Sequence, residues 1–295
     1  MILGQLLNGL VVGSMYALVA LGYTLVLGVL HRLNFAHSSV FIIGGFAGIV
    51  AAGVGFDFWS ALLFALLIGG MLGLIIEAIS FSKFGSEESA ITASLSSLAV
   101  GLLVTDLVRH KWGADPVPIT LAAEFLRGGW TAFNVRFVPI QAVILGTTIV
   151  LLLALHLVIF RTRLGRNIRA VADSPANAAR LGINVKFSSQ QVFFISSALA
   201  SAAGLLFAVR IGTANTDIGL AIGLKALAVM AIGGMGDIRG AVVGGLLVGL
   251  IETLGVSFGL GRLSDLTVWV LMILVLLIRP QGLFGSRLHG AQTRV

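Results

Sequence analysis

The sequence predicts an all-α polytopic membrane protein, and its composition is the main reason. Apolar residues make up 58% of the 295 residues, and charged residues make up only 11%. An average soluble domain is about 25% charged, so these charges are too few to cover a water-soluble surface. The composition excludes a soluble enzyme, a disordered chain and a collagen-like chain. The absence of cysteine excludes disulfides and thiolate metal sites.

Apolar segments of membrane-spanning length are the second reason. A transmembrane helix needs about 20 apolar residues, which leaves room for about eight to ten spans in a chain of this length. We expect nine spans, at residues 6–30, 38–54, 58–81, 90–108, 138–160, 189–212, 220–234, 240–258 and 265–279.

The seventh span, residues 220–234, is the weakest of these predictions. It has only 15 residues, is rich in glycine and contains Lys225. A broken or re-entrant helix near residues 220–240 is the alternative, because such backbone is tolerated at membrane depth where protein buries it.

Glycines at four-residue spacing predict how the helices pack. Pairs such as Gly9/Gly13 and Gly245/Gly249 place small residues on one helix face. Small residues let helix backbones approach closely in lipid, where no hydrophobic effect drives helices together. We therefore expect a tightly packed bundle.

Charge placement predicts the orientation of the spans in the lipid bilayer. Residues 161–188 contain six basic residues and one acid, the strongest bias in the chain. Cytoplasmic loops carry an excess of Lys and Arg, so we expect this loop in the cytoplasm and residues 109–137 outside. Counting spans from there places the N-terminus outside and the C-terminus in the cytoplasm. The net charge of +7 then reflects topology and gives no reason to expect nucleic-acid binding.

The basic loop has the sequence pattern of two short helices. Residues 165–173 predict the first helix, with Arg169 and Asp173 one turn apart. Ser174 is a suitable N-cap for the second helix and is followed by proline at the first helical position. Gly182 is suited to end that helix.

The second short helix favours a protein partner. It is built from small residues and lacks the Trp, Phe or Leu face that membrane surfaces prefer. The alternative is a lipid-facing loop whose basic residues meet anionic headgroups.

Charged residues inside the expected spans are costly and are usually functional. Glu77, Asp106 and Asp265 lie near span ends, where they can reach water. Lys225 and Glu252 lie deeper. These two either pair across helices or line a hydrated pathway, and the sequence leaves both alternatives open.

Catalytic and nucleotide-binding motifs are lacking. The sequence has no Walker A loop and no HExxH motif, and its five histidines are scattered. We therefore expect no enzymatic activity, no cofactor and no metal site in this chain.

Four blocks carry a resemblance to a known family, and the resemblance covers nearly the whole chain, with residues 109–137 the least characteristic part. These blocks resemble the shorter of the two permease types in branched-chain amino acid ABC importers. The blocks are residues 9–28, the turn Asn34-Phe-Ala-His37, residues 223–252 and the segment Arg279-Pro-Gln-Gly-Leu-Phe-Gly285. Ser38 stands where the family usually has glycine.

The resemblance implies a type II-like ABC importer permease fold that works by alternating access in a bacterial or archaeal plasma (inner) membrane. Residues 1–295 would form a single transmembrane permease domain, paired with a second permease that is a longer relative or another copy. Two separate ATPase subunits would bind ATP, and an extracytoplasmic solute-binding protein would deliver substrate. Leucine, isoleucine and valine are the expected substrates, and relatives with similar permeases carry urea, short amides or aromatic acids.

The resemblance also implies that residues 161–188 form the ATPase-coupling loop. The general importer pattern there is Glu-Ala-Ala, three residues and Gly. Ala176 and Asn177 depart from that pattern, whereas Ala178 and Gly182 fit it. The docking helix is therefore expected, without a specific salt bridge at the missing Glu. The expected coupling residues are Arg166, Arg169, Asp173, Ala178, Arg180 and Gly182.

The translocation pathway is expected to involve Asn34, His37, Lys225 and Glu252. A stand-alone secondary carrier or channel that uses Lys225 and Glu252 is the alternative from another functional class.

Overall fold

Nine apolar helices make up most of the computed structural model, which describes all residues except 1, 85–88, 122–127, 133–134 and 286–295. Each of the nine segments expected to span the membrane is helical in this described part. The helices are α1 (Ile2–Leu30), α2 (His37–Val54), α3 (Phe58–Ile76), α4 (Ala90–Trp112), α6 (Pro139–Arg161), α9 (Val185–Ile211), α10 (Asp217–Gly233), α11 (Ile238–Gly255) and α12 (Ser264–Ile278).

The prediction of a polytopic helical membrane protein is confirmed. Within the described ranges, seven helices are long and apolar enough to cross a bilayer. Two of the nine expected spans fall short of that length: α10 has 17 residues and α12 has 15. Helix α10 is continuous over its 17 residues, and whether it crosses the membrane or re-enters stays a prediction.

Short elements fill the connections between the long helices. They include two small antiparallel sheets, β1 with β4 and β2 with β3, which the all-α prediction did not anticipate. The short elements are η1 (Glu77–Phe81), β1 (Val117–Pro118), β2 (Trp130–Ala132), β3 (Val135–Phe137), α7 (Arg163–Asp173), α8 (Pro175–Arg180), β4 (Thr213–Ala214), η3 (Val256–Leu260) and η4 (Gly261–Leu263).

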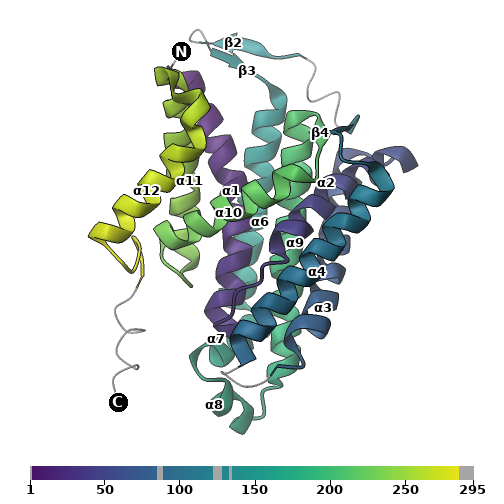
Figure 1. Cartoon of the computed structure of the whole chain (residues 1–295), viewed down its shortest axis with the longest axis vertical. Coiled ribbons are helices and arrows are strands. Elements are labelled where there is room, and N and C mark those ends of the chain that lie inside the picture. The colour runs from purple at the N-terminus through teal and green to yellow at the C-terminus, as the bar shows by residue number, and fades with distance from the viewer. Residues whose placement is uncertain (1, 85–88, 122–127, 133–134, 286–295) are drawn as a thin grey trace.

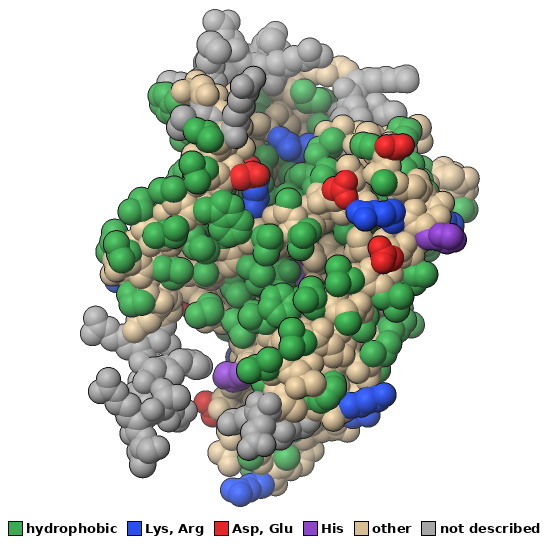
Figure 2. All heavy atoms as spheres, in the orientation of Figure 1, with side chains coloured by type: hydrophobic (Ala, Val, Ile, Leu, Met, Phe, Trp, Pro, Cys, Tyr) green, Lys and Arg blue, Asp and Glu red, His purple; other side chains and the backbone are tan. Residues whose placement is uncertain are grey.

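Helices α1 and α9 form the centre of the bundle. In their most apolar windows 89% and 83% of the residues are buried, against 22% in α4 and 28% in α6. Helices α4 and α6 therefore lie at the periphery of the bundle, with apolar side chains exposed. On the face of the molecule drawn in Figure 2, a band of hydrophobic side chains separates charged groups toward the two ends.

Glycine makes the contact between α1 and α11 possible, as the sequence spacing predicted. A Cβ atom on Gly13 would lie 2.7 Å from the carbonyl oxygen of Gly245. A Cβ atom on Gly245 would lie 2.6 Å from the backbone nitrogen of Ala17. Such distances leave no room for a side chain, so the two backbones approach each other directly.

The two polar loops lie at opposite ends of the bundle (Figure 1). Helices α7 and α8 are at one end, and β2 and β3 are at the other end, where α1 begins. The chain after α12 returns to the turn between α10 and α11. There the Leu283 N–H donates to the Ile232 carbonyl at 2.8 Å, and the Phe284 N–H donates to the Gly233 carbonyl at 2.9 Å.

Candidate functional site

Helices α7 and α8 form a compact two-helix loop, and local hydrogen bonds fix their ends. The Gly165 N–H donates to the Thr162 side chain at 3.1 Å, which caps α7. The Asn177 N–H donates to the Ser174 side chain at 3.3 Å, which caps α8 as predicted. Gly182 ends the loop with a φ of +81°, a conformation that favours glycine.

The inner face of this loop packs on the bundle. Ile168 and Val171 of α7 are 2% and 0% exposed, and Ala178 of α8 is 2% exposed. Ala178 therefore belongs to the packed side of the loop. Its carbonyl accepts hydrogen bonds from the N–H groups of Leu181 and Ile183 at 3.2 and 3.0 Å, which closes the end of α8.

Arg169 is directed toward the bundle. Its guanidinium donates to the Ile159 carbonyl in the last turn of α6 and lies 5.4 Å from the centre of the Phe160 ring. The predicted one-turn pairing of Arg169 with Asp173 is not formed among the described residues. The reason is that the last carbonyls of a helix lack partners within the helix, and Arg169 satisfies one of them.

The outer face of the loop carries the remaining expected coupling residues. Arg166, Asp173 and Arg180 are exposed, and so is Gly182. Leu181 is 80% exposed at the end of α8, the highest exposure among the large hydrophobic side chains in the described part of the chain. The sequence-based list of coupling residues does not include Leu181. An apolar residue directly before the terminating glycine was the available signal.

A cavity of about 350 Å³ lies between α7, the end of α1 and the α10–α11 turn. Arg169 and Ala172 of α7 line it, together with Gly28 of α1 and Asp237 and Arg239 from the start of α11.

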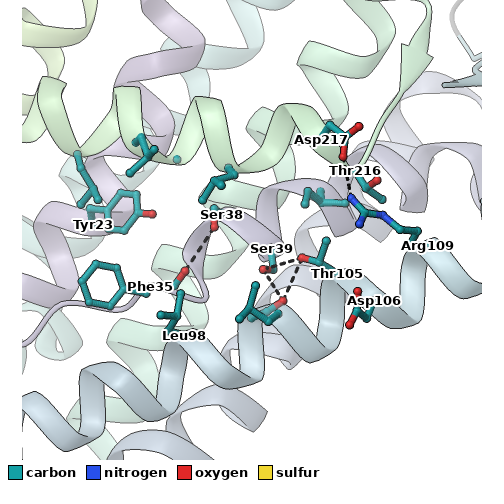
Figure 3. Close-up of a pocket in the computed structure, with 17 residues that line it drawn as sticks. Tyr23, Phe35, Ser38, Ser39, Leu98, Thr105, Asp106, Arg109, Thr216 and Asp217 are labelled. Carbon is teal, nitrogen blue, oxygen red and sulfur yellow. Dashed lines mark hydrogen bonds and ion pairs between the residues drawn. The ribbon is translucent and has the colours of Figure 1, made fainter. Parts of the chain in front are cut away.

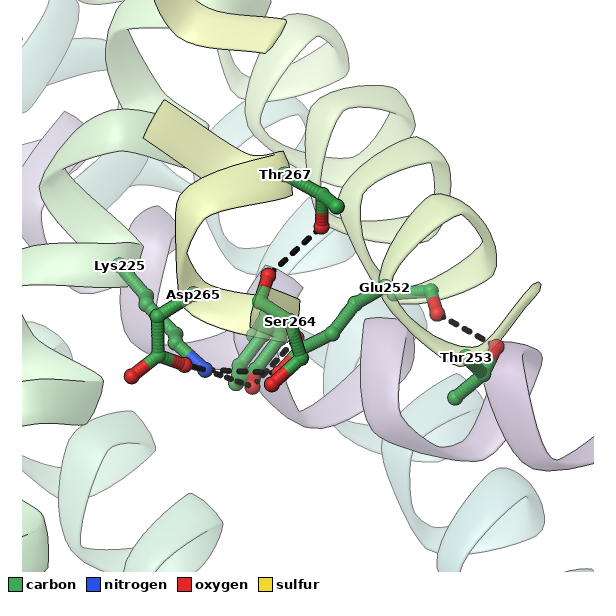
Figure 4. A network of polar contacts seen from close by, with 8 residues as sticks. Lys225, Glu252, Thr253, Ser264, Asp265 and Thr267 are labelled. Carbon is green, nitrogen blue, oxygen red and sulfur yellow. Dashed lines mark hydrogen bonds and ion pairs between the residues drawn. The ribbon is translucent and has the colours of Figure 1, made fainter. Parts of the chain in front are cut away.

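Lys225 and Glu252 form an ion pair inside the bundle. The Lys225 ammonium lies 2.7 Å from Glu252 Oε1 and also 2.7 Å from Asp265 Oδ1 (Figure 4). The Tyr16 hydroxyl donates to Glu252 Oε2 at 2.9 Å. The Lys225 and Glu252 side chains are 10% and 13% exposed, whereas that of Asp265 is 68% exposed. The cluster joins α1, α10, α11 and α12.

Asn34 and His37 are buried in the turn between α1 and α2. Their exposures are 1% and 0%. The Asn34 side-chain oxygen accepts from the Ala36 N–H at 3.1 Å. His37 Nε2 lies 3.2 Å from the Val19 carbonyl, and the His37 ring centre lies 4.4 Å from that of Tyr23. These contacts order the turn, and a pathway-lining role for both residues stays a prediction.

Metal-ligating side chains do not converge in the described part of the chain: it contains no group of three or more His, Asp or Glu residues that could hold a metal ion. The arrangement offers instead a two-helix surface at one end, an ion cluster in the bundle and cavities between helices.

Comparison with known proteins gives consistent matches over the chain. A family model described as "Branched-chain amino acid transport system / permease component" matches residues 5–276. The chain is 33% identical to the high-affinity branched-chain amino acid transport system permease protein LivH of Salmonella typhimurium, covering 96% of this chain and 95% of LivH. It is also 33% identical to BraD of Pseudomonas aeruginosa, which carries the same description, over the same shares of both chains. Among solved structures, PsaBC from Streptococcus pneumoniae in complex with Fab matches with a TM-score of 0.48 and 16% identity, covering 93% of this chain and 91% of that chain.

Proposed function

The chain belongs to the family of permease components of branched-chain amino acid transport systems, and from this we propose that it is the membrane-spanning permease subunit of an ATP-driven importer of leucine, isoleucine and valine. It is a multi-pass membrane protein, with seven described helices that are long and apolar enough to span a bilayer. As a permease of this family it works together with other components of an ABC importer.

The exposed face of α7 and α8 is the observation that carries the proposal. Arg166, Arg180 and Leu181 project from a loop whose other side is packed on the bundle. A surface with exposed arginines and an exposed apolar side chain suits a protein partner, since a few residues that become buried, arginine prominent among them, supply most of the binding energy at interfaces. We assign this face to the docking of an ATPase subunit, and its end of the bundle to the cytoplasm.

The partners follow from this assignment. Two ATPase subunits bind and hydrolyse ATP, because the sequence has no Walker A loop of its own. A second permease, either a longer relative or a second copy, completes the membrane part, and an extracytoplasmic solute-binding protein delivers substrate. The N-terminus and residues 109–137 then lie outside, and the C-terminus lies in the cytoplasm.

Alternating access requires a path from the docking surface into the bundle. Arg169 joins α7 to the end of α6 and also lines the cavity at the α10–α11 turn. Movement of α7 on ATP-driven closure would therefore reach α10, whose Lys225 is tied to α11 and α12. The ion pair of Lys225 with Glu252 would make α10 move together with its neighbours.

The proposal is tested by reversing charge on the docking surface. The double variant Arg166→Glu/Arg180→Glu should lose co-purification with the ATPase subunits and lose leucine uptake, while membrane insertion stays normal. Lys111→Glu is the matched control, because it reverses the charge of an exposed residue in the last turn of α4, outside the docking surface. This variant should retain ATPase association and leucine uptake. Normal ATPase association of the double variant would contradict the docking assignment. Uptake of urea, short amides or aromatic acids in place of leucine would support the assignment as an importer permease and change only the assigned substrate.

A further inference from the structure

A cavity of about 260 Å³ lies between α2, α4 and α10, separate from the docking loop and the ion cluster (Figure 3). Its two ends differ in chemistry. Tyr23, Phe35 and Leu98 lie at one end in Figure 3, and charged and hydroxyl side chains gather at the other. The cavity is partly open, since Leu102 and Leu220 in its lining are 61% and 62% exposed. A concave site with an apolar part and a few polar groups is the usual form of a small-molecule site.

The polar end holds one cation and two carboxylates. Arg109 Nη2 lies 2.7 Å from Asp217 Oδ1, and these side chains are 44% and 67% exposed. An exposed ion pair contributes little to stability, and a guanidinium has five N–H donors, so Arg109 can also bind an incoming carboxylate. Asp106 lies one turn before Arg109 on α4 and has no hydrogen bond or ion pair within the described residues. The cavity therefore offers a free carboxylate next to a guanidinium.

A buried hydroxyl without a partner lies at the polar end of the cavity. Thr216 lines the polar end and is 3% exposed, and its Oγ1 has no hydrogen-bond partner in the described part of the chain. Buried polar groups are almost always hydrogen-bonded. Ser39 and Thr105, on the opposite wall, already bond to each other at 3.1 Å. The Thr216 hydroxyl is thus an unsatisfied polar group beside the site, and less than 1 Å² of its oxygen is exposed.

Aliphatic side chains form the rest of the lining. They come from three helices and present branched surfaces to the space between them. These residues are Ile42, Leu98, Leu102, Leu220, Leu224 and Leu227. A volume of about 260 Å³ lies below the roughly 300–1,000 Å³ of sites for drug-sized ligands, so the cavity suits a smaller molecule.

We propose that this cavity binds a zwitterionic amino acid with an aliphatic side chain, with Arg109 on its carboxylate and Asp106 on its ammonium group. A simple anion would leave Asp106 unpaired, and a simple amine would leave Arg109 bound to Asp217 alone. A lipid chain would fill the apolar part and use neither charge. An aliphatic amino acid satisfies both charges and the apolar walls. This inference rests on the proposed function, because it makes the cavity a binding site for the transported substrate.

Binding to the purified full-length chain in lipid nanodiscs tests the proposal with L-leucine as the probe. Three analogues compete against it: 4-methylpentanoate lacks the ammonium group, 3-methylbutylamine lacks the carboxylate, and glycine lacks the side chain. Each should bind more weakly by about tenfold or more, because each lacks a group that the cavity recognises. Equal competition by the first two, or no leucine binding, would overturn the proposal. This arm uses the unaltered protein and does not depend on the folding of a variant.

Variants locate the site. Arg109→Gln and Asp106→Asn should each weaken leucine binding by about tenfold or more, since a hydrogen bond to a charged group is lost. Lys111→Gln, on the same helix and outside the cavity lining, should bind as the parent does. Unchanged binding in both cavity variants would overturn the assignment.

Import by the assembled transporter separates failure of this inference from failure of the proposed function. The inference expects Arg109→Gln to raise the KM for leucine or to abolish import. If the parent complex imports leucine and Arg109→Gln does so with unchanged KM, only the cavity assignment is wrong. If the assembled parent imports no amino acid, the proposed function itself is wrong.

Discussion

The ammonium group of Lys225 lies 2.7 Å from the carboxylate of Glu252, and this ion pair joins α10 to α11 inside the bundle. The sequence left open whether these residues pair with each other or line a hydrated path, and in this structure they pair. Asp265 adds a second carboxylate at 2.7 Å from Lys225 and brings α12 into the same cluster. The short helix α10 is thereby tied to two neighbours at one point.

Removing Lys225 tests whether this cluster holds the helices together. Lys225→Met leaves two carboxylates without their cation, and breaking a buried pair typically costs about 3–5 kcal/mol. The free energy of unfolding in detergent should fall by a similar amount. Adding Glu252→Gln should restore part of the loss, because the buried charge is then removed. A single variant as stable as the parent would contradict the structural role.

Gly245 tests the close packing of α1 on α11. In Gly245→Ala the new Cβ would lie 2.6 Å from the Ala17 backbone nitrogen. Overpacking of this kind costs about 1–3 kcal/mol, so the thermal unfolding temperature should fall. Gly146→Ala on α6 is the control, because its Cβ would meet no atom within 4 Å. Equal unfolding temperatures for the two variants would argue against the packing account.

Gly282 tests the return of the chain to the α10–α11 turn. Its φ is +78°, and a Cβ there would lie 2.6 Å from the Ala231 carbonyl oxygen and the Gly234 nitrogen. Gly282→Ala should release the hydrogen bonds of Leu283 and Phe284, which hydrogen exchange at those two amides would report as faster exchange. Gly212→Ala, with a φ of +84° and open space around it, carries the same backbone strain without the clash. If the two amides still exchange slowly in Gly282→Ala, the clash does not break the hydrogen bonds of Leu283 and Phe284.

Leu181 tests the apolar part of the docking surface. At 80% exposure its substitution should leave the fold intact, whereas truncating an interface anchor costs about 2 kcal/mol or more, roughly 30-fold in affinity. Leu181→Asp should therefore bind the ATPase subunits at least that much more weakly in a pull-down titration. Leu181→Met keeps an apolar side chain and should bind normally. If Leu181→Asp binds the ATPase subunits with full affinity, Leu181 is not part of the interface.

The helical fold was predictable from the sequence because the signal is local. Runs of apolar residues identified all nine helical segments, and capping residues such as Ser174 and Gly182 identified the two-helix loop. The boundaries were less accurate at polar ends. Helix α4 continues to Trp112, past residue 108, because its last turn accepts the basic residues Arg109, His110 and Lys111, which are favourable at a helix C-terminus.

The candidate site was less predictable because it depends on contacts between distant segments. Asp106 and Asp265 were assigned to span ends, and nothing local indicated that one would line a cavity and the other would join Lys225. Arg169 looked like a surface residue, yet it bonds to the Ile159 carbonyl of the preceding helix. Such roles follow from the packing of helices, which the sequence pattern alone does not specify.

Leucine uptake into proteoliposomes tests whether this chain is the permease subunit of an ATP-driven importer. Uptake should require ATP on the side of α7 and α8, together with the ATPase subunits, the second permease and the solute-binding protein. The chain reconstituted alone should show no uptake on a solute or ion gradient. Gradient-driven leucine uptake by the chain alone would contradict the importer account and favour a stand-alone carrier that uses Lys225 and Glu252.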